Sequence, residues 1–272
     1  MALDMNTQLS ELEATGLEVV DLQDDPGFWE RKVHVRNIAT QMTGMHRLAH
    51  AFVENPDTIL QELVNAAVEL CGADSAGISL EQEDGTDAEF YEWVATAGQY
   101  AGFLNATLPR NPSACGKCLE RGGPQRFRVT QRFFDQMGVE APVVEDGLLL
   151  PWRVGETRGT VWIMAHTRTE AFDGEDLRMM QVLAQFAAMG VRQQRQQKKL
   201  MEQASANAAA VMANDLAHKI NNPLQSLVNV VYLAAEGQSG GDTKELAREL
   251  SGDLERLSGL VKKLLVLPGI SR

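Results

Sequence analysis

Residues 159–188 of this chain read GTVWIMAHTRTEAFDGEDLRMMQVLAQFAA. The run TVWIMAH (160–166) is rich in β-branched and aromatic residues, which predicts a strand. After a short turn, Asp173 is placed to cap a helix, and Asp176 three positions later makes a variant of the capping box. This stretch therefore predicts a strand that leads through a turn into a capped helix.

The helical pattern that starts at Asp173 continues to Glu236, interrupted only by Gly190 and Pro223. At about 1.5 Å per residue such a helix would approach ~95 Å, far beyond a typical globular helix. Its middle part, 196–210, is too polar to be buried all round and needs a partner helix. We therefore expect a parallel coiled coil within a homodimer.

A loop, GQSGGD (237–242), separates this helix from a last one that begins at Thr243. The last helix carries an apolar stripe at steps of three and four: Leu246, Leu250, Leu254, Leu257, Leu260 or Val261, and Leu264. Two such antiparallel helices from each of two chains would make a four-helix bundle. Residues 211–268 are thus predicted to form an α-helical hairpin that dimerises.

Upstream of the quoted stretch, two helices precede a set of short strands. The first is expected over 26–54 and has an apolar stripe, and the second, over 57–72, has Asp57 as its expected cap. The stripe of the first helix is Ile38, Met42, Met45, Ala49 and Phe52. The further strands expected are 75–81, 89–98 and 147–155, with a hairpin turn at 83–87 and an irregular insert from Gly98 to Gly147. This order predicts an α+β domain with an antiparallel sheet and helices on one face, preceded by a loose polar arm at 1–25.

Inside the long helix, residues 218–224 read HKINNPL. Proline in a helix interior costs about 3 kcal/mol, which suggests a functional reason for keeping it. The expected apolar stripe is Leu216, Ile220, Leu224, Leu227 and Val231, and His218 lies about 200° away from it, facing water. An exposed imidazole offers a nucleophilic nitrogen. An ordinary solvated helix residue is the alternative interpretation.

The stretch AHKINNPLQSL resembles the phosphoacceptor box of sensor histidine kinases, and the hairpin that follows resembles their dimerisation and phosphotransfer domain. The resemblance implies that His218 is phosphorylated, that Pro223 bends the helix beside it, and that Asn222 helps to polarise the phosphoryl-transfer site. It also implies a response-regulator receiver domain as the partner. Lys219, however, stands where the family usually has an acidic residue, and an ammonium has no lone pair to accept a proton.

The chain ends at LVLPGISR (265–272), without the asparagine box and glycine-rich lid of the ATP-binding domain of that family. ATP chemistry would therefore come from a separate kinase catalytic domain or from residues beyond a truncated end. Two alternatives stay open. One is a non-enzymatic docking platform that sequesters a response regulator, and the other is a ligand-binding protein that uses the hairpin only to dimerise.

Residues 55–195 resemble a GAF sensor domain, on the order of helices and strands and on the Gly-led strand, Phe172-Asp173 and exit helix of the quoted stretch. The resemblance implies a small ligand, of unknown identity, held between the sheet and the insert at roughly 100–145. Cys115 and Cys118 lie in this insert and form a CxxC, which indicates either a redox or metal-sensing pair or two small buried thiols. No second pair of ligands accompanies them, so no metal site is predicted.

Two weaker signals have structural interpretations. His46 and His50 are four apart on the first helix and could chelate a metal, although ordinary helix positions are the simpler interpretation. Trp93, Trp152 and Trp162 lie on predicted strands and are expected in the core rather than in a ligand cage.

The composition narrows the class of protein. The chain has 25 basic and 37 acidic residues, a formal net charge of −12, which argues against nucleic acid as a partner. No apolar run approaches the roughly 20 residues that cross a bilayer, and the first residues lack the pattern of a signal peptide. A cytoplasmic signalling protein is expected.

Overall fold

The computed structural model describes residues 14–54, 57–82, 86–235 and 243–264. The chain divides into two compact units, Met1–Arg195 and Gln196–Arg272, which are described separately. Within the described ranges, no helix combines the length and the apolar character that a bilayer span requires.

The first unit is built on one antiparallel sheet of seven strands in the order β1-β5-β6-β7-β2-β3-β4. The strands are β1 (Leu17–Asp21), β2 (Ser75–Glu81), β3 (Tyr91–Gly98), β4 (Thr107–Leu108), β5 (Gln125–Val129), β6 (Val144–Val154) and β7 (Thr157–Ala165). The predicted strand 75–81 coincides with β2, and the other expected strands lie within a few residues of β3, β6 and β7. The predicted turn at 83–87 falls largely outside the described residues.

The helices belong to two groups, one in each unit. Those of the first unit are η1 (Leu22–Asp24), α2 (Pro26–Trp29), α3 (Ile38–Glu54), α4 (Ile59–Cys71), η2 (Ala101–Phe103), α5 (Ala114–Arg121) and α6 (Gln131–Met137). The long helix α7 (Gly174–Ala235) begins in the first unit and continues into the second, where α8 (Thr243–Leu264) follows. The prediction of one uninterrupted helix through Gly190 and Pro223 is confirmed. Helix α4 begins at Ile59 with Thr58 at its N-cap position, so the prediction of Asp57 as the cap is wrong.

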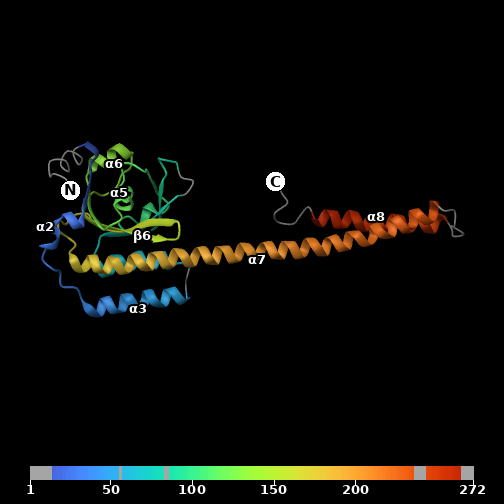
Figure 1. Ribbon diagram of the computed structural model, residues 1–272, viewed down its shortest axis with the longest axis horizontal. Helices are drawn as coiled ribbons and strands as arrows, with labels where there is room; N and C mark the ends of the chain where they lie inside the picture. Colours follow the sequence, from blue (N-terminus) through green and yellow to red (C-terminus); the bar gives the residue numbers. More distant parts are fainter. Residues whose placement is uncertain (1–13, 55–56, 83–85, 236–242, 265–272) are drawn as a thin grey trace. The chain divides into compact units, whose positions relative to one another are not determined.

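Both faces of the sheet are covered, so the prediction of helices on one face only is wrong. One core lies between the sheet, α4 and the first part of α7, and it takes Val161 and Ile163 from β7. The other lies between the sheet, α5 and α6, and it takes Trp162 and Met164 from the same strand. Figure 1 shows α5 and α6 on the side of the sheet opposite to α7. Alternate residues of a strand point to opposite faces, which is why β7 contributes apolar side chains to both cores.

The insert and the start of the chain are more regular than expected. Strand β5, inside the insert, pairs with β6 on one side and with β1 on the other, where Leu17 lies opposite Val129. Residues Leu17–Asp21, predicted to belong to a loose arm, are therefore an edge strand of the sheet. The segment 26–54 is not one helix either, because residues 30–37 form a linker without regular secondary structure between α2 and α3.

The face of helix α3 that packs on α4 coincides only in part with the predicted stripe. Its buried residues are Gly44, Leu48 and Ala51. Of the predicted stripe, Met45 and Phe52 are half-buried, whereas Ile38, Met42 and Ala49 are exposed. A Cβ at Gly44 would lie only 2.8 Å from Leu70 Cδ2, so the two helices meet where a side chain is missing. The predicted stripe was built from large apolar residues, and it missed this contact because the contact depends on a glycine.

The second unit is the hairpin of α7 and α8. On α7 the buried and half-buried apolar positions of the hairpin are Leu216, Ile220, Pro223, Leu227 and Val230, whereas Leu224 and Val231 of the predicted stripe are exposed. Pro223 and Val230 are therefore the buried residues, where the predicted stripe had Leu224 and Val231. On α8, Leu250, Leu257 and Leu260 are half-buried, and Leu254 and Val261 are exposed. The side chains of Leu246 and Leu264 lie outside the described residues.

Candidate functional site

A cavity of about 60 Å³ lies between the sheet and the helices α5 and α6. Its wall is formed by strands β1 and β3–β7, by the insert and by the short helices α5 and α6. None of the residues that line it carries a charge. They are Leu17, Trp93, Tyr100, Leu108, Ser113, Ala114, Cys115, Phe127, Val129, Phe133, Phe134, Val144, Leu149, Trp162 and Met164.

Two glycines let large aromatic rings lie flat on the sheet in the wall of this cavity. Gly77 on β2 is directly opposite Trp162 on β7, and a Cβ at Gly77 would lie 2.1 Å from Trp162 Cζ2. Gly147 on β6 is opposite Phe127 on β5, and its Cβ would lie 2.4 Å from Phe127 Cε1. Any larger residue would have to lift the ring off the sheet. The shape of the cavity therefore depends on both glycines.

Two buried indole groups in the wall have polar atoms that the protein does not satisfy. The Nε1 atoms of Trp93 and Trp162 have no hydrogen-bond partner among the described residues, and neither does that of Trp152 on the other face. The rings of Trp93 and Trp162 have centroids 4.8 Å apart. An unpaired buried donor costs about 1–3 kcal/mol. Both Nε1 atoms are covered by protein atoms, so the surface that the cavity offers is almost wholly apolar. The three tryptophans are buried as predicted, but two of them also line the cavity.

Cys115 lines the cavity, whereas Cys118 lies in the same core without lining it. Ser113 caps α5, and the hydroxyl of Thr160 donates a hydrogen bond to Cys115 Sγ at 3.3 Å. Burial raises the pKa of both thiols, because the thiolate would lose its hydration. Burial likewise raises the pKa of Cys71 on α4. All three cysteines are free and protonated at neutral pH, which disfavours the redox interpretation of the CxxC.

Tyr100, which lines the cavity, belongs to a second group of buried polar residues. Tyr100 donates from its hydroxyl to Pro142 O at 2.6 Å, and its ring stacks on the ring of His166 at 4.9 Å. His166 lies 2.7 Å from both Val143 O and Ser75 Oγ. The two ring systems thereby hold the segment before β6 against the sheet. Sequence reasoning missed this group, because the partners of His166 lie 23 and 91 residues away.

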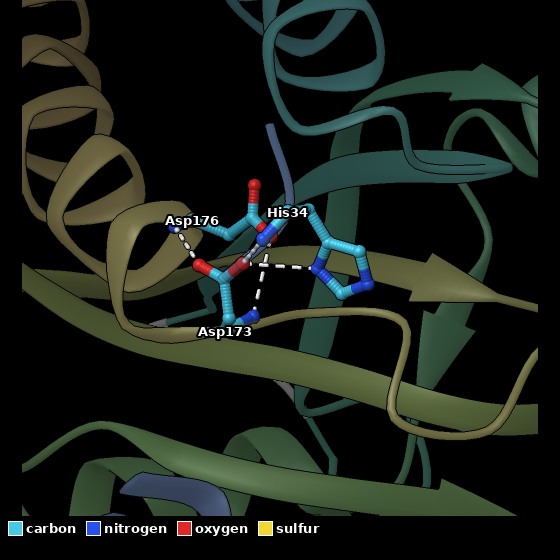
Figure 2. Close-up of side chains that lie close together, drawn as sticks. All are labelled: His34, Asp173 and Asp176. Carbon is cyan, nitrogen blue, oxygen red and sulfur yellow. Dashed lines mark hydrogen bonds and ion pairs between the residues drawn. The ribbon is translucent and has the colours of Figure 1, made fainter. Parts of the chain in front are cut away.

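The start of α7 is fastened to the linker before α3 by three side chains that converge there (Figure 2). Asp173 Oδ1 accepts hydrogen bonds from the backbone N–H groups of Glu175 and Asp176, and the Asp173 N–H donates to Asp176 Oδ2. The predicted reciprocal capping box is therefore confirmed. Asp173 Oδ2 also accepts from the His34 backbone N–H at 2.6 Å and lies 2.9 Å from His34 Nδ1.

Arg36, two residues further along the linker, forms a bidentate ion pair with Asp176, at 2.9 and 3.2 Å. Burial tends to raise the pKa of Asp173, but the backbone hydrogen bonds outweigh it and lower that pKa. At Asp176 burial prevails over Arg36, and its pKa is raised. The ligand atoms of His34, Asp173 and Asp176 lie within 4.8 Å of one another, close enough to bind a cation. All four carboxylate oxygens of Asp173 and Asp176 already accept hydrogen bonds from the protein. The cluster is therefore better explained as a structural link that holds the start of α7 against the linker.

In the second unit, His218 is exposed on α7, as are Lys219 and Asn222, whereas Pro223 is buried against α8. Lys219 Nζ lies 2.8 Å from Asp215 Oδ2, one turn earlier. Lys219, Asn222 and Pro223 line a groove with Asp253 and Arg256 of α8, and His218 is not among the lining residues. His46 and His50 on α3 are both exposed, with His50 Nε2 3.3 Å from Glu54.

Comparison with known proteins bears on the first unit. The sequence pattern of the GAF domain family matches residues 53–192. No curated protein matches the sequence of the chain.

Among solved structures, the chain is similar to the GAF domain of a phosphoenolpyruvate-protein phosphotransferase from Coxiella burnetii. They share 17% identity over 60% of this chain and 99% of the other, with a TM-score of 0.44. The GAF domain of a protein assigned as a sensor histidine kinase from Pseudomonas syringae pv. tomato is 17% identical over 60% and 93% of the two chains (TM-score 0.40). The phycoerythrobilin-bound GAF domain of a cyanobacterial phytochrome is 14% identical over 59% and 98% (TM-score 0.43).

Proposed function

The chain belongs to the GAF domain family, and we propose that it is a signalling protein of the histidine-kinase type. In this proposal the cavity of the first unit binds a small ligand, and the ligand controls phosphorylation of His218 and transfer of the phosphoryl group to a response regulator. The proposal rests on α7, a single helix of 62 residues that starts at the sheet of the GAF domain and carries His218.

The hydrogen bonds and ion pair of Asp173 and Asp176 attach the start of this helix to the first unit. A shift of the sheet or of the insert would move the start of α7, and the continuous backbone would carry a rotation or translation along it. Small shifts of packed helices are a common switching device. We propose that such a shift changes the surroundings of His218.

The chemistry assigned to His218 needs an exposed, neutral imidazole. One ring nitrogen attacks the γ-phosphorus of ATP, a P–N bond forms, ADP leaves, and the ring loses its proton to solvent or to a base. In the second step an aspartate carboxylate of the receiver domain attacks the phosphorus, a P–O bond forms and the P–N bond breaks. ATP would be presented by a separate kinase catalytic domain. His218 is accessible to such partners because its side chain is exposed.

A homodimer is part of the proposal. The hairpin has apolar residues that α7 and α8 do not cover themselves: Leu224, Val228, Val231, Leu254 and Val261. Packing against a second hairpin as a four-helix bundle would bury them.

A second candidate is favoured by the ion pair of Lys219. Its ammonium is paired with Asp215, so position 219 supplies a fixed positive charge where the kinase family usually has a proton acceptor. In this candidate His218 carries no phosphate, and the hairpin binds a receiver domain without catalysis.

Phosphate incorporation separates the two candidates. The whole chain and His218→Gln are incubated with labelled ATP, with and without an added histidine-kinase catalytic domain. We expect acid-labile label that requires the added domain and is lost in the variant. The absence of label under every condition, with a natural kinase labelled in parallel, would overturn the phosphorelay and leave the docking platform.

A further inference from the structure

We propose that a second copy of this chain packs along α7 from Met179 to Val231, parallel and in register, so that the GAF domains take part in the homodimer. The inference deepens the proposed function, whose homodimer rests on the hairpin, and extends the interface into the first unit. It follows from the phase, the exposure and the chemistry of one stripe of residues on α7.

One heptad phase runs along α7 without a break. Alternating steps of three and four residues connect Met179, Val182, Phe186 and Met189 at one end with Leu224, Val228 and Val231 at the other. We call the residues at these steps the α7 seam. A seven-residue repeat with apolar residues at steps of three and four is typical of a helix that faces a partner helix in a coiled coil.

The chain itself leaves the α7 seam uncovered in both of its units. In the first unit Val182 is 39% and Met189 is 56% exposed, although neighbouring residues of α7 pack against the sheet. In the second unit Leu224, Val228 and Val231 are exposed, although α7 packs on α8 there. The structure describes every residue of the seam, and none of them is buried. Exposed apolar side chains that recur in one phase indicate an interaction surface.

Helix α3 adds a shorter apolar stripe to this surface in the first unit. Its residues recur at the same steps, and Ile38 and Met42 among them are largely exposed. At the other end of the stripe, the ring of Phe52 lies 5.1 Å from the ring of Phe186, which belongs to the α7 seam. The first unit therefore offers apolar side chains on two helices, which a second GAF domain could cover in a helical bundle.

The polar middle of the α7 seam indicates which partner fits. Asn207, Asn214 and Asn221 follow one another at intervals of seven residues and occupy the same heptad position as Met179. An asparagine in a coiled-coil seam needs a polar group opposite, because its amide would otherwise be buried without a hydrogen bond. Two facing asparagines satisfy each other, since an amide both donates and accepts.

Only a parallel copy in register places each asparagine of the seam opposite itself. A parallel copy displaced by one heptad would place Leu200 against Asn207 and Asn221 against Val228. An antiparallel copy would place asparagines against the other set of seam positions, which includes Ala210 and Ala217. The seam therefore favours a second copy of this chain as the partner and fixes its direction.

Disulfide formation between copies of the whole chain tests the inference. Met189→Cys places a thiol in the seam of the first unit, and Leu224→Cys places one in the hairpin. In a parallel pair in register, each new thiol meets its counterpart across the two-fold axis. Gln181→Cys and Asn229→Cys are the matched controls, because both positions are exposed on α7 but lie outside the seam. The three native cysteines are free and buried.

After mild oxidation we expect Met189→Cys and Leu224→Cys to form linked dimers at least about tenfold faster than the two controls, because thiols held apart cannot form a disulfide. Asn207→Ile should lower the dissociation constant of the dimer at least about tenfold, as measured by analytical ultracentrifugation. Ser205→Ile, at an exposed position outside the seam, should leave that constant unchanged. Thermal unfolding of each variant verifies that it is folded.

Cross-linking of Leu224→Cys without cross-linking of Met189→Cys would overturn the inference and leave a dimer made by the hairpins alone. A monomeric chain without either cross-link would overturn the homodimer as well, and an unchanged dimer in Asn207→Ile would overturn the pairing of the asparagines. Failure of the proposed phosphorelay looks different. In that case both cysteines form linked dimers, but His218 takes no phosphate in the presence of the catalytic domain.

Discussion

Two ion pairs along α7 have nearly the same N–O distance and opposite surroundings. Asp176, at its start, lies 2.9 Å from Arg36, and Asp215, close to His218, lies 2.8 Å from Lys219. The Asp176 side chain is 2% exposed, whereas the Asp215 side chain is 59% exposed. Water screens the second pair and not the first, so equal distances do not mean equal contributions to stability.

This contrast separates two tasks of one helix. The buried start of α7 is held by Asp173, Asp176 and the linker residues, and it contributes to the stability of the GAF domain. The side chains of His218, Lys219 and Asn222 are exposed and contribute little to stability, so they are accessible to partner proteins. The expected effects of substitution follow this division.

Loss of the cation that pairs with the buried Asp176 should have the largest effect. Arg36→Met leaves the Asp176 carboxylate buried without its partner and should lower the free energy of unfolding by about 3 kcal/mol. Lys219→Met, the matched change at the exposed pair, should cost less than about 0.5 kcal/mol. Urea unfolding of both variants measures the difference. Equal losses in the two variants would show that burial does not distinguish the pairs.

Substitution of a glycine beneath the flat rings of the cavity wall should lower stability nearly as much. Gly77→Ala places a Cβ 2.1 Å from Trp162 Cζ2 and should destabilise the domain by about 2 kcal/mol while shifting the fluorescence of Trp162. Gly102→Ala is the control, because a Cβ there meets nothing within 4 Å. A stable Gly77→Ala variant with unchanged fluorescence would contradict the packing of this wall.

Lowering the pH should reduce the contribution of the Asp173 carboxylate to the free energy of unfolding. Its pKa is lowered in the folded state, so its contribution is present above the ordinary value of 3.8 and is lost as the pH falls through the folded pKa. The raised pKa of Asp176 acts in the opposite direction. Asp173→Asn removes only the first contribution and should cost about 1 kcal/mol at pH 6 and less at pH 3.

Urea unfolding at the two pH values follows this change, with Asp215→Asn as the exposed control. A constant difference between Asp173→Asn and the wild type at both pH values would show that the charge of Asp173 does not matter.

The smallest effect on stability is expected at the residue with the largest proposed role. His218 is exposed, so His218→Gln should change the free energy of unfolding by less than about 0.5 kcal/mol. Thermal unfolding of the variant and the wild type checks this. A clear destabilisation would mean that His218 packs against something, for example a partner hairpin, instead of facing solvent.

Sequence reasoning succeeded where the decisive interactions are local. The capping box of Asp173 and Asp176 and the continuity of α7 depend on residues within a few positions of one another, and both were predicted. It failed where partners are far apart in the chain. Strand β1 is too short to be recognised without β5, more than 100 residues away, and His34 and Arg36 find their carboxylates 139 and 140 residues later.

The candidate site divides in the same way. A ligand pocket next to the insert and Cys115 was expected from the family resemblance; the structure has a cavity there, and a ligand in it stays a proposal. The shape of the cavity was not predictable, because the aromatic rings and the glycines beneath them are matched across strands. His218, Asn222 and Pro223 as a phosphorylation site remain a prediction from the motif.

The most direct test of the proposed coupling changes the phase of α7 between its two parts. Four or seven residues of helix-forming sequence are inserted within 196–210, and acid-labile phosphate on His218 is measured with labelled ATP and an added catalytic domain. Seven residues preserve a heptad phase and four do not. We expect a wild-type phosphate level with seven residues and a clearly altered level with four. The same level in all three proteins would contradict transmission through α7.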